Sequence, residues 1–141
     1  MMIRMLDHTA DVGFEIEALT LEALFDEARR ALLLTGFERP SEQGEEERSM
    51  HISAPDLETL LVRWINELIY LVQDAGFVPA SAKVWVREDG AEAFSADALL
   101  AGSPLDLEGC GWQGEIKGAT FHGLAVVREE ERWRARVILD V

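Results

Sequence analysis

The first forty residues carry two successive hydrophobic patterns. From Val12 to Ala18 apolar residues alternate with others, a period of two that predicts a half-buried strand. Apolar residues then recur every three or four positions over residues 21–36, where Thr20 can cap the N-terminus and Gly36 ends the run. We therefore expect a helix whose single apolar face packs on a sheet.

A second and longer amphipathic pattern predicts another helix. Ser53 and Asp56 have the spacing of a capping box with Pro55 in the first turn, and the pattern continues to Gln73 or Asp74. The expected core stripe consists of Leu57, Leu60, Leu61, Trp64, Ile65, Leu68, Ile69 and Val72. A short strand over residues 48–52 should precede this helix.

The rest of the chain is typical of antiparallel hairpins. Residues 82–87 and 91–96 flank a turn, and residues 119–128 and 133–139 flank the glutamate run 129–131, with a loop expected over 101–114. Strands and helices followed by hairpins predict an α+β fold. We expect two helices packed on one mainly antiparallel or mixed sheet, in a single-domain sandwich that spans residues 1–141.

Composition narrows the functional classes. The chain has 13 basic and 27 acidic residues, a net charge of −14, which should repel phosphate backbones. We therefore expect no direct high-affinity binding of nucleic acid. Apolar runs are too short for a membrane span and no signal peptide is apparent, so we expect a cytoplasmic protein. Cys110 is the only cysteine, which excludes an internal disulfide.

Three polar segments could carry chemistry: residues 7–11, 115–123 and 138–141. Asp140 ends an apolar strand beside the terminal carboxylate, so a hard cation such as calcium, magnesium or manganese would relieve the repulsion there. His8 or His122 could shift this preference toward a transition metal. The alternative is that Asp140 simply lies in solvent, and that the residues around Asp11 only form a turn.

Four segments together resemble the archease family. They are residues 8–13 (HTADVG), residues 56–68 (DLETLLVRWINEL), the segment from Glu115 to His122, and the terminal Leu139-Asp140-Val141. They occur in the family's order and span nearly the whole chain. One departure is Gly118, where the family pattern has an alanine-like residue.

The resemblance implies a function. Archeases are small α+β proteins that act as cofactors of the RtcB-type RNA ligase of tRNA splicing, promoting its guanylylation and multiple turnover. By this resemblance Asp11 and Asp140 are metal-binding residues, Val141 is an additional ligand, and Lys117 is required for ligase activation. The favoured ion is calcium, with magnesium or manganese as alternatives.

Two other functional classes stay open. A stand-alone metal-dependent phosphoester hydrolase could use the same aspartates with Lys117 on a phosphate and His122 as acid or base. A general chaperone would bind many unfolded proteins. No phosphate-binding loop, serine nucleophile elbow or zinc-peptidase helix motif occurs in the sequence.

Overall fold

The computed structural model describes residues 2–7, 11–37, 44–90, 93–105 and 116–141. Within these ranges the chain forms two helices and seven strands. In chain order they are β1 (Met2–Asp7), β2 (Asp11–Ala18), α1 (Leu21–Gly36), β3 (Glu46–Ala54), α2 (Leu57–Gln73), β4 (Phe77–Gly90), β5 (Ala93–Pro104), β6 (Gly118–Glu129) and β7 (Arg132–Asp140).

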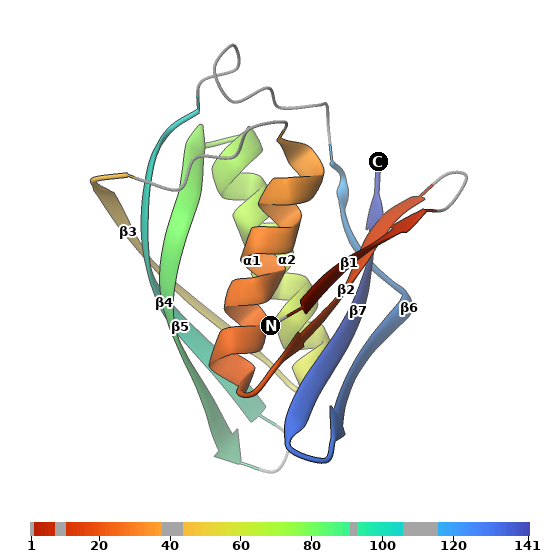
Figure 1. Ribbon diagram of the computed structural model, residues 1–141. Coiled ribbons are helices and arrows are strands. Elements are labelled where there is room, and N and C mark those ends of the chain that lie inside the picture. The colour runs from red at the N-terminus through yellow and green to blue at the C-terminus, as the bar shows by residue number, and fades with distance from the viewer. Residues whose placement is uncertain (1, 8–10, 38–43, 91–92, 106–115) are drawn as a thin grey trace.

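The strands form two antiparallel sheets with the helices between them. One sheet has the order β1-β2-β7-β6 and the other the order β3-β5-β4. Each helix contacts strands of both sheets, and Figure 1 shows the helix pair as the middle layer. The expected α+β fold is confirmed, but the strands are divided between two sheets where we expected one.

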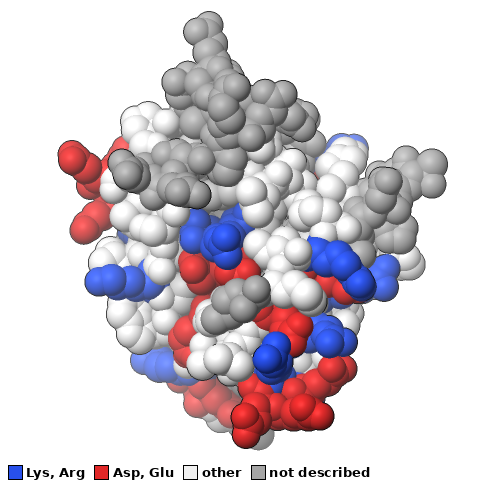
Figure 2. Space-filling view, viewed as in Figure 1, with Lys and Arg blue, Asp and Glu red and all other residues white. Residues whose placement is uncertain are grey.

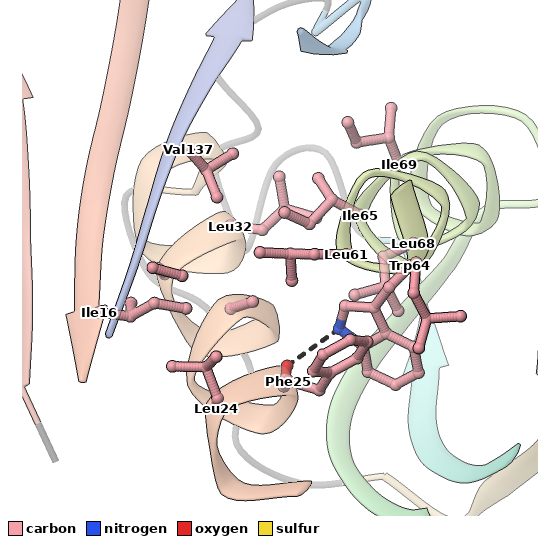
Figure 3. Close-up of a cluster of buried hydrophobic side chains, with 14 of the residues drawn as sticks. Ile16, Leu24, Phe25, Leu32, Leu61, Trp64, Ile65, Leu68, Ile69 and Val137 are labelled. Carbon is pink, nitrogen blue, oxygen red and sulfur yellow. Dashed lines mark hydrogen bonds between the residues drawn. The ribbon is translucent and has the colours of Figure 1, made fainter. Parts of the chain in front are cut away.

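The core lies where the two helices meet the sheets. Side chains from α1, α2, β2 and β7 converge there (Figure 3). Trp64 is fully buried, its ring centroid is 5.7 Å from that of Phe25, and its Nε1 donates a hydrogen bond to the Phe25 carbonyl at 2.9 Å. Its expected core position is confirmed.

The helix starts follow capping chemistry. Thr20 caps α1 as expected, its hydroxyl accepting a bond from the Ala23 amide at 3.1 Å. The expected capping box at Ser53 is wrong, because Asp56 is the N-cap of α2 and accepts a bond from the Thr59 amide at 2.7 Å. Ser53 instead pairs with β5, since β3 continues to Ala54.

Several strands differ from the expected ranges. The structure adds β1, and β3 runs past residues 48–52 at both ends. Strand β4 starts at Phe77, five residues early, and β5 continues to Pro104 into the expected loop. The four residues that begin β4 are all buried, so they show no alternation of apolar and polar positions.

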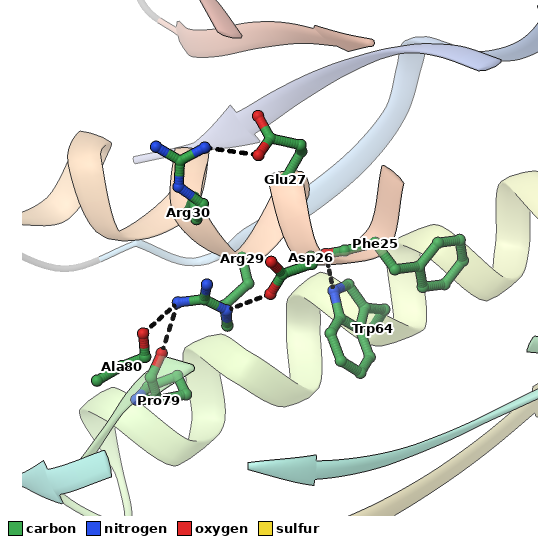
Figure 4. Close-up of polar contacts among 8 residues, drawn as sticks. All are labelled: Phe25, Asp26, Glu27, Arg29, Arg30, Trp64, Pro79 and Ala80. Carbon is green, nitrogen blue, oxygen red and sulfur yellow. Dashed lines mark hydrogen bonds and ion pairs between the residues drawn. The ribbon is translucent and has the colours of Figure 1, made fainter. Parts of the chain in front are cut away.

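A buried arginine ties α1 to β4 (Figure 4). The pairing of β4 with β5 is interrupted between Val78 and Ser81, and this leaves the intervening carbonyls free for other donors. Arg29 is 5% exposed, and its Nη1 donates to the carbonyls of Pro79 and Ala80 at 3.0 and 2.9 Å. The buried charge is therefore bonded to a bulge of the strand.

Neither helix in the described part of the chain is long and apolar enough to cross a membrane.

Candidate functional site

Three segments that are far apart in sequence meet at one end of the four-stranded sheet. Asp11 of β2 is the register partner of Asp140 of β7. On the other side of β7, Gly118 of β6 is also in register with Asp140, and the Lys117 amide donates a bond to the Asp140 carbonyl at 2.8 Å. Asp140 is thus the central position, near the C-terminus marked in Figure 1.

The side chains of Lys117, Asp140 and Val141 at this end are open to solvent. Lys117 and Asp140 are exposed, and Val141 is 51% exposed. No group of three or more histidine, cysteine or acidic side chains close enough to hold a metal occurs among the residues whose side chains the structure describes. The side chains of His8, Asp11, Cys110 and Glu115 are among those that the structure does not describe. The backbone of Asp11 is described, and it places this residue beside Asp140.

Helix α2 holds the segment that carries Lys117. Gln73 bonds both polar groups of the Ile116 backbone: its Nε2 donates to the Ile116 carbonyl at 2.9 Å, and its Oε1 accepts from the Ile116 amide at 2.7 Å. A side-chain amide thereby supplies the two bonds that a neighbouring strand would make. The Ile116 side chain is 5% exposed in the core, so Lys117 directly follows a fixed residue.

A second α2 side chain contacts the segment on the other side of Lys117. Asn66 Oδ1 accepts a hydrogen bond from the Ala119 amide at 2.7 Å. A Cβ on Gly118 would lie 3.0 Å from this same oxygen, so an alanine there would require Asn66 to shift slightly. The sequence pattern placed Asn66 and Gln73 off the apolar stripe and gave them no role. One feature of the sequence could have drawn attention to Asn66: it is the only asparagine in the chain.

Beyond this segment β6 leaves regular pairing. Its register with β7 shifts between Thr120 and Ala125, and Gly123 has a positive φ of 73°. Phe121 is 60% exposed and His122 is also exposed, with the His122 amide donating to Thr120 Oγ1 at 3.1 Å. Bulges of this kind commonly border functional sites, where they redirect side chains.

Comparison with known proteins decides the family. The model of the Archease protein family (MTH1598/TM1083) matches residues 4–141. The chain belongs to the archease family. Protein archease of Methanosarcina barkeri is 33% identical over 137 residues, covering 96% of this chain and 93% of that protein. Protein archease of Archaeoglobus fulgidus is 31% identical over 142 residues and covers all of both chains.

Solved structures of similar proteins share the archease fold. The solution structure of Methanobacterium thermoautotrophicum protein 1598 has a TM-score of 0.79 and 27% identity, over 99% of this chain and 98% of that one. A Thermotoga maritima archease, described as a "possible chaperone", has a TM-score of 0.61 and 22% identity, over 100% and 98% of the two chains. The second match supports the fold alone.

The opposite end of the same sheet has a surface hollow whose charged side chains form ion pairs with one another. The hollow is lined by Glu17, Glu129, Glu130, Arg132 and Arg134. Arg132 pairs with Glu17 at 3.1 Å and Arg134 with Glu129 at 3.4 Å. Figure 2 shows basic and acidic side chains mixed on the visible face, with acidic ones gathered at its lower end. We therefore regard the Asp140 end as the candidate functional site of this archease.

Proposed function

We propose that this archease activates an RtcB-type RNA ligase by presenting to it a divalent cation, held by Asp11 and Asp140, together with the ammonium group of Lys117. The observation that supports this most directly is the strand register. It places Asp11, Asp140 and the start of β6 on three adjacent strands at one end of the sheet.

The donor chemistry fits a hard cation. Opposite residues on antiparallel strands have Cα atoms about 4.5 to 5.5 Å apart, a separation at which two carboxylates can share one ion. Asp11 and Asp140 are such a pair, and Val141, the additional ligand that the family resemblance implies, follows one residue later. Carboxylate oxygens without thiolates favour calcium, with magnesium or manganese as alternatives. The cation would offset the mutual repulsion of the carboxylates.

Lys117 is suited to contact an anionic group on a partner. It is exposed, and none of the acidic side chains that the structure describes forms an ion pair with it. A compact ammonium with three donors can bind a phosphate or a carboxylate on the partner protein. Lys117 would therefore help to activate the ligase, and the archease alone would catalyse no turnover.

The overall charge supports a protein partner. A surface with a net charge of −14 is repelled by RNA but attracted to the basic groove that an RNA ligase must expose. Charge complementarity of this kind accelerates association and is screened by salt. The archease would therefore approach the ligase and leave RNA binding to it.

The test is a multiple-turnover ligation assay with three mixtures: ligase alone, archease alone, and both together. The proposal expects stimulation only in the complete mixture, with GTP and divalent metal present. Turnover of RNA or a simple phosphoester by the archease alone would support the hydrolase alternative. Suppression of aggregation of several unrelated unfolded proteins, without ligase stimulation, would support the chaperone role named for the Thermotoga maritima relative.

A further inference from the structure

We infer that Asn66 and Gln73 are positioning residues, through which helix α2 fixes the place of Lys117. The functional part of this inference rests on the proposed ligase activation, and the structural part does not. Neither side chain contacts the Lys117 side chain in the described contacts; both act on the backbone to either side of it.

Hydrogen bonds anchor the backbone of Lys117 and of the residues on both sides of it. Its own amide donates a hydrogen bond to the Asp140 backbone carbonyl at 2.8 Å, which ties the Lys117 backbone to that of Asp140. The residue before it is held by two bonds from Gln73, and the residue two positions after it by one bond from Asn66. The backbone is therefore fixed before, at and after Lys117.

The need for this anchoring follows from the local structure. Residues 116 and 117 precede β6, and β6 is an edge strand whose pairing with β7 is interrupted after Thr120. Only three consecutive register pairs, from Gly118 to Thr120, hold the start of the strand to β7. Without the bonds from α2 this short stretch could fray, because strand ends and edges open easily.

The two residues also explain the local sequence. Asn66 and Gln73 are seven positions apart, two helical turns, so they lie on one side of α2 and reach the same segment. The absence of a side chain at Gly118 leaves room for the Asn66 oxygen to reach the Ala119 amide. The helix thus links the buried core stripe around Trp64 to an exposed lysine.

The test compares Asn66→Leu and Gln73→Met, which remove the hydrogen bonds, with Asn66→Asp, which keeps an acceptor oxygen. Glu67→Leu, a polar-to-apolar change at the next position of α2, is the matched control. The first measurement is amide hydrogen exchange in the archease alone. We expect about fivefold faster exchange at Ala119 in Asn66→Leu and at Ile116 in Gln73→Met, and faster exchange at the Lys117 amide in both.

The second measurement is ligase stimulation as a function of archease concentration. We expect the maximal stimulation to fall by about tenfold in Asn66→Leu, with the half-saturating concentration little changed and with recovery in Asn66→Asp. Unchanged exchange at Lys117 in both bond-removing variants would overturn the inference, as would full stimulation by Asn66→Leu. If wild type itself gives no stimulation, the proposed function fails, and the exchange experiment still tests the positioning.

Discussion

Replacing Trp64 with alanine tests the packing that supports the site. The side chain is fully buried, it packs against Phe25, and its indole N–H bonds a helix carbonyl. Truncation leaves a cavity between the helices and removes that bond, a loss of about 3 to 5 kcal/mol in the free energy of unfolding. For 141 residues the unfolding entropy is about 0.3 kcal/mol/K, so the melting temperature should fall by about 10 to 17 °C.

The assay is thermal unfolding followed by circular dichroism, with two controls. Trp85 is 53% exposed on β4, so Trp85→Ala makes the same chemical change outside the core and should shift the melting temperature little. Trp64→Phe keeps most of the ring volume and loses the indole hydrogen bond, and should cost about 2 kcal/mol. Equal melting temperatures for Trp64→Ala and Trp85→Ala would refute the assigned role of Trp64 in the core.

Three further predictions concern charge. Calcium should raise the melting temperature of wild type and of the control variant Asp74→Asn, but not that of Asp140→Asn. An ion that binds only the folded state stabilises that state, and thermal scans with and without chelator measure the effect. Hydrogen bonds from the Thr59 side chain and backbone lower the pKa of Asp56 in the folded state. The ionised Asp56 carboxylate therefore stabilises the fold at any pH above its pKa in the unfolded chain, and this stabilisation is lost as the pH falls through the folded-state pKa. In urea unfolding, the stability of wild type relative to Asp56→Ser should therefore decline as the pH falls below about 4, and a gap equal at pH 7 and 3 would contradict this. The half-saturating concentration for ligase activation should rise with salt, and a salt-independent value would argue against electrostatic steering.

The helices could be predicted because their signals are local. The apolar stripe of α2 and the cap at Thr20 depend on residues within a few positions of each other. Even so, Ser53 and Asp56, three positions apart, are both good N-cap residues, and the sequence pattern favoured Ser53 where the structure has Asp56. Pairing with Ser95 draws Ser53 into β3, and this competing interaction is invisible in the local sequence.

The strands were harder because their partners are distant in sequence. Strand β1 is an edge strand whose described side chains are mostly exposed, so it lacks the alternation that a half-buried strand shows. The division into two sheets depends on the helix pair lying between them, which no single segment encodes.

The candidate site was only partly accessible from sequence. The sequence pattern singled out Asp140 and the segments that hold Asp11 and Lys117, and the resemblance to a family gave these residues their roles. Their proximity depends on the register of β2, β7 and β6. The roles of Asn66 and Gln73 could not be predicted from the sequence, because both residues also suit an exposed helix face. Only their hydrogen bonds to the segment around Lys117 reveal these roles.

The proposed role of Lys117 in ligase activation is tested by counting ligation turnovers per ligase molecule with saturating wild-type archease, Lys117→Ala or Lys83→Ala. Lys83 is the only other lysine in the chain and is exposed on β4 of the other sheet, so it controls for the loss of one positive charge. We predict multiple turnovers with wild type and with Lys83→Ala, and turnover no greater than that of ligase alone with Lys117→Ala. Equal turnover with both variants would contradict the proposed role of Lys117.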